Sequence, residues 1–273
     1  MVASLVFFNG APCAELDVRD RGLAYGHGAF ETMRLQGGQL PLWGYHLARL
    51  NHGLGRLGID LDGERLRLAL DTALANFPPQ GVVKLTVTAG VGERGYRMSG
   101  HPLPTLLIQW FPPPGPREVV KLQVCRYALP HNHRLAGIKH LNRLDQVLAA
   151  AELDPGCQGL LLDCRGNVIE ALSHNIFLRH RGWWLTPDLS LCGVAGVLRA
   201  VLLEEIMPAL GLTVEIARVS LEQLFAAEEV FICNSVTGIQ AVAAVDDSAT
   251  WSNHAQTQSV GARLEEAYPC FAA

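Results

Sequence analysis

The stretch Phe111-Pro112-Pro113-Pro114-Gly115-Pro116 interrupts a chain of 273 residues in which helix and strand patterns occur on both sides. Three consecutive prolines cannot enter a helix or a central strand, because proline lacks a backbone N–H and its ring fixes φ. We therefore predict a linker at 112–118, which separates an N-terminal lobe of residues 1–111 from a larger C-terminal lobe of residues 119–273.

Outward from this linker, strand and helix patterns alternate irregularly. In the N-terminal lobe we predict strands at 4–8, 30–35, 40–42, 82–89 and 105–110, and helices at 45–57 and 64–77. In the C-terminal lobe we predict strands at 119–127, 159–163, 168–172, 175–179, 183–186, 230–233 and 240–245, and helices at about 142–153 and within 193–210. Regular βαβ alternation is lacking, so the pattern predicts an α+β fold in two lobes, with a smaller α/β lobe first and a mixed β structure in the second.

Composition and charge exclude several classes of protein. The chain is 49% hydrophobic with a net charge of −4, which argues against a disordered chain and against a sequence-independent nucleic-acid binder. No apolar run approaches the roughly 18 residues of a membrane span. The apolar start lacks a basic leader, so we interpret it as a strand and not as a signal peptide. Seven scattered cysteines without a C-x-x-C pair argue against a disulfide framework or a zinc site and predict a cytoplasmic protein.

Two motif matches are rejected on their context. Residues 90–95 fit G-x-G-x-x-G, but a dinucleotide site needs a helix at the last glycine and an acidic residue about 20 positions on. Neither follows here, and the alternative is a loop that presents Arg94, Tyr96 and Arg97 to an anionic ligand. His131 and His133 lack a third ligand at suitable spacing, so we expect a polar loop and no metal site.

Lysines are scarce, and one of them has a distinctive context. Of the 22 basic residues, only Lys84, Lys121 and Lys139 are lysines. Lys139 lies in Gly-Ile-Lys-His-Leu-Asn-Arg-Leu just before a predicted helix, where apolar neighbours could desolvate its amine, lower its pKa and make it nucleophilic. The alternative is a solvated loop lysine, which spacing alone favours. We expect Lys84 and Lys121 to point to solvent or brace a sheet.

A carboxylate and two polar turns add further candidates. Glu170 shares a strand face with Val168 and Leu172, so it either waits for a buried positive partner or lies on an exposed face. Glycines before a helix, at 193–199, and the polar turn at 234–238 could offer backbone N–H groups to a phosphate, with Arg49 supplying charge. The alternatives are that the glycines only allow a tight turn into the helix, and that Arg49 is a solvated arginine on the helix face. Together, an amine, a carboxylate and an anion site match the needs of pyridoxal 5′-phosphate.

These residues resemble the fold-type IV pyridoxal-phosphate enzymes along nearly the whole chain. The resemblance rests on Lys139-His140-Leu141-Asn142-Arg143-Leu144, on Val168-Ile169-Glu170 and Asn175-Ile176-Phe177, on the early Asp20-Arg21-Gly22 and 25–32 signatures, and on 193–199 and 234–238. That group holds branched-chain aminotransferases, D-amino acid aminotransferases and 4-amino-4-deoxychorismate lyases. The lysine context looks most like the lyases, and Leu144 stands where branched-chain aminotransferases usually carry a tyrosine.

The resemblance implies a role for each matching position. Lys139 would be the catalytic lysine that holds the cofactor, Glu170 would pair with its ring nitrogen, and its phosphate would be held by Arg49, Ser235 and the N–H groups of Val197 and Leu198. Asn175, Arg94 and Tyr96 would contact substrate, and no metal is expected.

The implied reaction converts aminodeoxychorismate to 4-aminobenzoate and pyruvate in folate biosynthesis, in a homodimer that binds neither nucleic acid nor membrane. The alternatives are an aminotransferase of the same fold or a non-catalytic binding protein on this scaffold.

Overall fold

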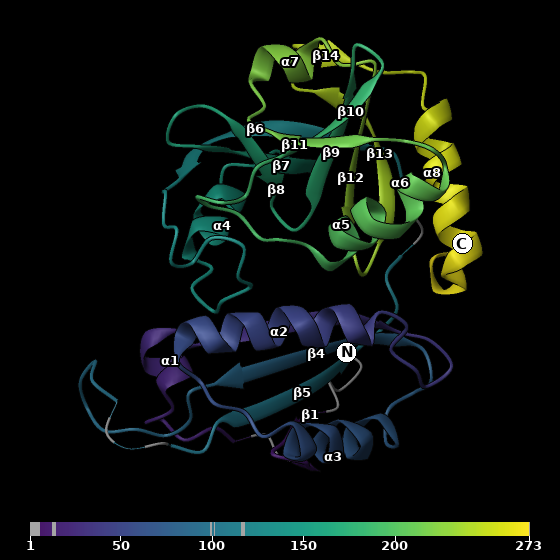
Figure 1. The fold of residues 1–273 in the computed structure, drawn as a ribbon. Coiled ribbons are helices and arrows are strands. Elements are labelled where there is room, and N and C mark those ends of the chain that lie inside the picture. Colours follow the sequence, from purple (N-terminus) through teal and green to yellow (C-terminus); the bar gives the residue numbers. More distant parts are fainter. Residues whose placement is uncertain (1–5, 13–14, 99, 101, 116–117, 273) are drawn as a thin grey trace. The chain divides into compact units, whose positions relative to one another are not determined.

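The computed structural model describes residues 6–12, 15–98, 100, 102–115 and 118–272 (Figure 1). Its contacts divide the chain into two compact units. Unit 1 consists of Met1–Pro114 with Ile138–Asn142, and unit 2 of Gly115–Gly137 with Arg143–Ala273. The lysine-bearing stretch therefore packs with unit 1, although its neighbours in sequence belong to unit 2. The predicted strand at 4–8 and the predicted linker at 112–118 lie partly outside the described residues.

Unit 1 is a five-stranded antiparallel sheet with helices packed on one of its faces. Its elements are β1 (Val6–Phe8), β2 (Ala11–Pro12), α1 (Arg21–Tyr25), β3 (Gly28–Leu35), α2 (Trp43–Leu57), α3 (Gly63–Leu74), β4 (Gly81–Thr88) and β5 (Thr105–Phe111), with strand order β2-β1-β5-β4-β3. Met33, Val83 and Trp110 are paired across the sheet and share one buried cluster with Leu50 of α2 and Leu70 of α3. Both helices therefore cover the same face.

Two predictions for unit 1 need correction. Residues 40–42 form no strand, because the turn at Gly37-Gly38 closes with one Gln36–Gln39 bridge and α2 begins at Trp43. The antiparallel partner of β3 is β4. The helix predicted at 64–77 ends at Leu74, ahead of the two prolines that follow Phe77.

Unit 2 is built on a mixed sheet (Figure 1, upper part). Its strands are β6 (Val120–Leu129), β7 (Cys157–Asp163), β8 (Val168–Ala171), β9 (Asn175–His180), β10 (Trp183–Pro187), β11 (Val214–Ala217), β12 (Glu229–Asn234), β13 (Gly238–Val245) and β14 (Ala249–Thr250). The order is β11-β10-β9-β12-β13-β6-β7-β8, with β14 on β13. Strand β6 runs parallel to β7 and β13, and β10 runs parallel to β11. The α+β fold with mixed β structure in the second half is confirmed.

Helices and two cores complete unit 2. The helical segments are α4 (Leu144–Ala150), α5 (Val197–Val201), the π-helix Leu202–Ile206, α6 (Met207–Ala209), α7 (Leu221–Phe225), α8 (Ala255–Ala267) and the 3₁₀ turn Pro269–Phe271. Leu160 and Leu161 are neighbours on β7 and point to opposite faces of the sheet. Each lies in a different hydrophobic core, so this strand is buried on both faces. Phe177 and Phe231 stack at 4.9 Å between ring centroids and fix β9 against β12.

The helix predicted at 142–153 is shorter and packs differently from the expectation. It runs only over α4, and Ala149 is its fully buried residue. The spacing of Leu144, Val147 and Leu148 in the sequence predicts that they share one apolar side of this helix, but they are 66%, 61% and 46% exposed. The helix lies against β6 and β7 through small residues, so its large apolar side chains face outward in the single chain.

Candidate functional site

Lys139 lies on the edge of the unit 1 sheet. The N–H of Phe30 donates to the Lys139 carbonyl at 2.9 Å, and the N–H of Leu141 donates to the Gly28 carbonyl at 2.9 Å. The preceding Ile138 is buried against α2, where a Cβ on Gly53 would lie 2.7 Å from its Cγ2. The lysine backbone is thus fixed in extended pairing with β3, and it does not belong to an open loop.

The Lys139 side chain is half-buried beside an aromatic ring. Its ammonium lies 4.6 Å from the centroid of Phe30, and the Lys84 ammonium lies 5.2 Å from the same centroid. Lys84 therefore belongs to the same neighbourhood as Lys139. An amine held at a defined place on a rigid strand edge can act as a nucleophile or as a base.

Arg49 is held by a buried carboxylate that the sequence analysis did not single out. Glu31 of β3 is 1% exposed and accepts hydrogen bonds from Arg49 Nε at 2.8 Å, from Arg49 Nη2, and from the ring Nδ1 of His46 at 2.6 Å. Arg49 itself is 12% exposed, so the interpretation as a solvated helix-face arginine is wrong. The sequence offered only the two-residue alternation of this strand, which puts Glu31 on the same face as Ala29 and Met33; the structure shows that this face is the buried one.

The charges in this cluster are fixed by opposing effects. Burial alone raises the pKa of Glu31, but the Arg49 charge and the hydrogen bonds from His46 and Arg49 outweigh it and hold the pKa below its usual value. Burial lowers the pKa of His46 and outweighs its hydrogen bond to Glu31. The cluster therefore consists of a carboxylate, a guanidinium and a neutral imidazole.

Glu170 is buried in unit 2, where a backbone N–H group donates a hydrogen bond to it. It is 4% exposed on β8, and its Oε2 accepts the N–H of Val194 at 2.8 Å. The preceding Gly193 has φ +84°, and a Cβ there would lie 2.7 Å from Ile169 Cγ2 and 3.3 Å from Glu170 Oε2. Glycine is therefore required for the turn to approach this carboxylate. The alternative of an exposed Glu170 is wrong.

Asn175 fixes the other end of the same turn. It is 5% exposed, and its Nδ2 donates to the Val194 carbonyl at 2.9 Å. A Cβ on Gly196 would lie only 2.0 Å from Asn175 Oδ1. Both glycines of the Gly193-Val194-Ala195-Gly196 turn are thus explained by two buried polar side chains that reach it from neighbouring strands.

The turn leads directly into a helical run over residues 197–209. Val197 and Leu198 occupy its first turn, where N–H groups have no partner within the helix and can bind an anion. Arg199 is buried beneath this turn, with Nη2 on the Pro187 carbonyl at 3.1 Å and Nε on Thr186 Oγ1 at 3.2 Å. Burial lowers the pKa of Arg199.

Ser235 lies in a second tight turn, between β12 and β13. Asn234 Oδ1 accepts the N–H groups of Val236 at 2.9 Å and Thr237 at 2.7 Å, which closes the turn. Thr237 Oγ1 also contacts His174 Nε2 at 3.1 Å. Ser235 is 9% exposed at the apex, and the predicted polar turn is confirmed.

Arg94 and Tyr96 lie on an exposed loop of unit 1. Tyr96 is 88% exposed and Arg94 is exposed, whereas the loop backbone is bound by Arg21 of α1. Units 1 and 2 thus each carry part of the predicted set: Lys139, Arg49, Arg94 and Tyr96 lie in unit 1, and Glu170, Asn175, Val197, Leu198 and Ser235 lie in unit 2.

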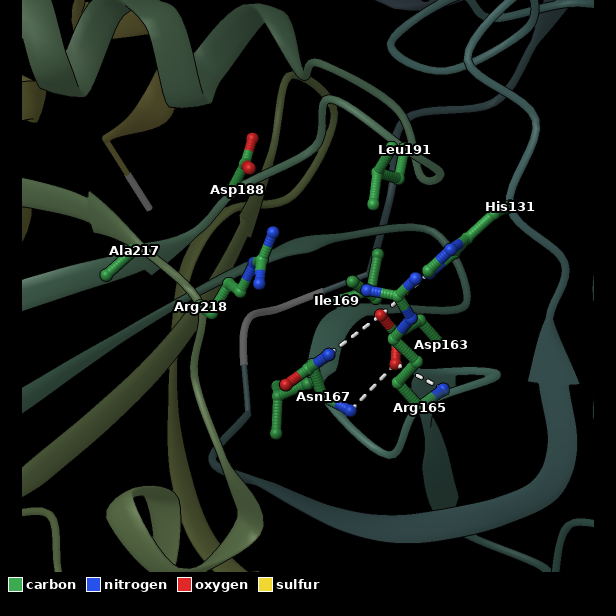
Figure 2. Close-up of a pocket in the computed structure, with 10 residues that line it drawn as sticks. His131, Asp163, Arg165, Asn167, Ile169, Asp188, Leu191, Ala217 and Arg218 are labelled. Atoms are coloured by element: carbon green, nitrogen blue, oxygen red, sulfur yellow. Dashed lines mark hydrogen bonds and ion pairs between the residues drawn. The ribbon is translucent and has the colours of Figure 1, made fainter.

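The pocket in Figure 2 is a small polar cavity of unit 2. It holds about 20 Å³, room for about one water molecule, and is lined by residues that include Arg165, Asn167 and Arg218. His131 Nε2 lies 2.9 Å from Asp163 Oδ2, so this histidine braces a buried carboxylate. Over the described part of the chain, no group of three or more metal-type ligands occurs. Within the same residues, no helix is both long and apolar enough to cross a bilayer.

Comparison with known proteins identifies the family. The sequence profile of the family described as amino-transferase class IV matches residues 28–245. The chain belongs to the amino-transferase class IV family. It is 34% identical over 248 residues to the aminodeoxychorismate lyase of Vibrio harveyi, a match that covers 88% of this chain and 91% of that protein.

Solved structures match this fold along nearly the whole chain. The 4-amino-4-deoxychorismate lyase of Pseudomonas aeruginosa matches with a TM-score of 0.91 and 43% identity over 97% of this chain and 99% of that chain. The branched-chain aminotransferase of the thermophilic archaeon Thermoproteus uzoniensis, solved with norvaline, matches with a TM-score of 0.85 at 21% identity over 96% and 94% of the two chains. The fold-type IV expectation is therefore confirmed.

The side chains of this class IV chain fit a phosphorylated pyridine cofactor in kind. A fixed amine, a buried carboxylate beside a glycine turn, and helix-start N–H groups are what such a cofactor needs for covalent attachment, for its ring nitrogen and for its phosphate. Close approach of Glu170 to Gly193 and of Asn175 to Gly196 places the buried carboxylate next to the turn that begins the helical run of unit 2.

Proposed function

We propose that this chain is a pyridoxal-phosphate-dependent lyase that converts 4-amino-4-deoxychorismate to 4-aminobenzoate and pyruvate, a step of folate biosynthesis. The observation that carries the proposal is the 43% identity to a solved 4-amino-4-deoxychorismate lyase over 97% of the chain, together with the fixed amine of Lys139. Leu144, five residues after this lysine, argues against a branched-chain aminotransferase.

Lys139 has two roles in this proposal. It would hold the cofactor covalently, and its free, neutral amine would remove the proton from the ring carbon that carries the substrate nitrogen. Pyridoxal phosphate supplies the electron sink that makes this proton acidic. Enolpyruvate then leaves from the neighbouring ring carbon as the ring becomes aromatic, and protonation of enolpyruvate gives pyruvate. No oxidant or keto acid is consumed.

The other residues bind and orient. The Glu170 carboxylate, which the Val194 N–H holds in place, would pair with the cationic ring nitrogen. Arg49, Ser235 and the N–H groups of Val197 and Leu198 would hold the phosphate. Asn175, Arg94 and Tyr96 contact the substrate, whose two carboxylates suit an arginine-bearing loop.

The proposal includes a cytoplasmic homodimer. Leu144, Val147 and Leu148 form an exposed apolar face on α4, which supports burial against another surface. Burial raises the pKa of Cys192 and of Cys233 to about 12, so these buried thiols are unreactive.

A Lys139→Ala variant tests the proposed role of the lysine, with Lys121→Ala as the matched control because Lys121 is exposed on β6. We expect Lys139→Ala to lose the visible absorbance of the covalently bound cofactor and nearly all production of 4-aminobenzoate. Lys121→Ala should keep both. Turnover retained in Lys139→Ala would contradict the mechanism.

A further inference from the structure

The loop at 90–97 is bound along its backbone by a buried arginine from α1. Arg21 is 4% exposed, and its Nη1 and Nη2 donate to the carbonyls of Gly95 at 3.0 Å and Tyr96 at 2.8 Å. These partners lie more than 70 residues further along the chain. The two ends of one guanidinium thus hold two consecutive peptide groups, which fixes both the position and the direction of the loop.

Tyr25 completes this contact from the same short helix. Its hydroxyl accepts the N–H of Gly95 at 2.9 Å, and its ring lies 5.5 Å from that of Tyr96. The Arg21 guanidinium carbon lies 4.9 Å from the centroid of the Tyr25 ring. A Cβ on Gly92 would lie 3.0 Å from Arg21 Cδ, so the loop also closes over the stem of the arginine. Both polar groups of the Gly95 residue are therefore satisfied by α1.

The base of this contact is tied to the strands on both sides of the loop. Asp20 is fully buried and accepts hydrogen bonds from Thr88 Oγ1 at 2.9 Å and Thr105 Oγ1 at 2.7 Å, at the end of β4 and the start of β5. The N–H of Arg21 donates to the Gly90 carbonyl at 2.9 Å. Asp20 and Arg21 thus fix the loop at its root and at its tip.

The third guanidinium nitrogen of Arg21 is also engaged. Arg21 Nε donates to His27 Nδ1 at 3.2 Å, so Nδ1 acts as the acceptor. The proton of this imidazole must then lie on Nε2, which contacts the Leu57 carbonyl at 2.9 Å. The guanidinium is held from a third direction and cannot swing away without breaking this chain of contacts.

The charged and aromatic side chains of the loop remain accessible to solvent. Arg94, Tyr96 and Arg97 are all exposed, although the backbone that carries them is fixed. Fixing a binding loop in advance removes an ordering cost that the ligand would otherwise have to offset. A pair of exposed guanidiniums on a rigid backbone suits a ligand with more than one carboxylate.

We propose that Arg21 is a positioning residue for substrate binding: it holds the loop at 90–97 so that Arg94 and Tyr96 meet an anionic substrate in a fixed geometry. This inference rests on the proposed function for the identity of the substrate, a dicarboxylate. Arg21 acts through the loop backbone, so its loss weakens binding and leaves the chemistry at Lys139 in place.

The test compares Arg21→Gln, Arg21→Lys and Tyr25→Phe with the control Arg19→Gln. Arg19 is exposed and its side chain pairs with Asp17, two residues away. Each holoenzyme is assayed for kcat and KM with aminodeoxychorismate, for bound-cofactor absorbance, and for the rate at which trypsin cuts after Arg94 and Arg97. Trypsin reports on the loop directly, because it needs several residues of flexible backbone around these arginines.

We expect Arg21→Gln to raise KM about tenfold or more with kcat within about threefold of the wild type, the pattern of a lost binding interaction. Trypsin cleavage in the loop should accelerate, and cofactor absorbance should not change. Arg21→Lys should be intermediate, since an ammonium reaches one carbonyl and not two. Tyr25→Phe should show the same direction with a smaller effect, and Arg19→Gln should match the wild type.

Two outcomes overturn the inference. Faster loop cleavage with an unchanged KM would show that the loop does not bind substrate. Unchanged cleavage in both Arg21→Gln and Tyr25→Phe would show that these residues do not hold the loop. A wild-type enzyme without lyase turnover would instead refute the proposed function. The KM part of the inference would fall with it, whereas the cleavage result would still decide whether Arg21 holds the loop.

Discussion

Replacement of Glu31 by glutamine tests the buried cluster that holds Arg49. Glu31 is 1% exposed and is bonded to both Arg49 and His46. Glutamine keeps the shape but removes the charge, which leaves the Arg49 guanidinium without its counter-charge. Breaking a buried ion pair from one side costs about 3–5 kcal/mol. Because the amide oxygen still accepts one hydrogen bond, we expect a loss near the lower end, about 3 kcal/mol.

The assay is thermal unfolding of the cofactor-free protein at neutral pH, with Glu64→Gln as the control. Glu64 pairs with Arg67 on the exposed side of α3, and such exposed pairs contribute little to stability. For a chain of this size, 1 kcal/mol shifts Tm by roughly 2–4 °C, so Glu31→Gln should unfold about 6–12 °C lower than the wild type. Glu64→Gln should leave Tm close to that of the wild type.

The difference in Tm between the wild type and Glu31→Gln should depend on pH in a definite direction. The pKa of Glu31 is held below its usual value, so its contribution to stability is fully present above the unfolded pKa, near 4.3. That contribution is lost as the pH falls through the folded pKa. The gap in Tm between wild type and Glu31→Gln should therefore be constant from about pH 5 to 7 and should narrow in stronger acid.

The same variant should bind pyridoxal phosphate more weakly in an absorbance titration, because Arg49 loses the carboxylate that orients it. A Tm within about 2 °C of the wild type would refute the energetic reasoning. A large Tm loss with unchanged cofactor affinity would refute the idea that Glu31 orients Arg49 for the phosphate.

Two further substitutions probe unit 2. Gly196→Ala places a methyl group 2.0 Å from Asn175 Oδ1, so it should cost about 1–3 kcal/mol and weaken cofactor binding. Gly261→Ala, in the interior of α8, has open space and should instead stabilise the protein by about 0.5–1 kcal/mol and leave cofactor binding unchanged. Urea unfolding and cofactor titration check both. Hydrogen bonds, including one from His131, hold the pKa of Asp163 at about 2 despite burial. The ionised Asp163 therefore stabilises the fold above about pH 4, and this stabilisation is lost between about pH 4 and 2. In Asp163→Asn, the urea midpoint should not fall with this added dependence on acid. Identical pH profiles of the urea midpoint for the wild type and the variant would contradict this role of Asp163.

Local chemistry explains which parts of the site were predictable from the sequence. A carboxylate at an alternating strand position marked Glu170 as either buried or on an exposed face, and the structure shows it buried; glycines before an apolar run predicted the turn into α5. Both signals lie within a few residues of the feature they predict. The hairpin around Arg165-Gly166-Asn167 was predictable for the same reason.

Contacts across long sequence separations were not predictable. Arg21 was noted only as part of a signature, because its partners Gly95 and Tyr96 lie far along the chain. Glu31 escaped notice because its burial depends on Arg49, which arrives on a helix packed over the sheet. Leucine spacing likewise predicted an apolar side for the helix at 142–153 but could not tell which side packs inward.

The central claim is that the chain carries out a lyase reaction, and an acceptor-free turnover assay tests it most directly. The holoenzyme is supplied with aminodeoxychorismate generated in place, without any keto acid, and 4-aminobenzoate and pyruvate are followed together. We expect both products to appear in equal amounts. Absence of both products, combined with amino transfer from D-alanine or a branched-chain amino acid to 2-oxoglutarate, would contradict the lyase and leave an aminotransferase of the same fold.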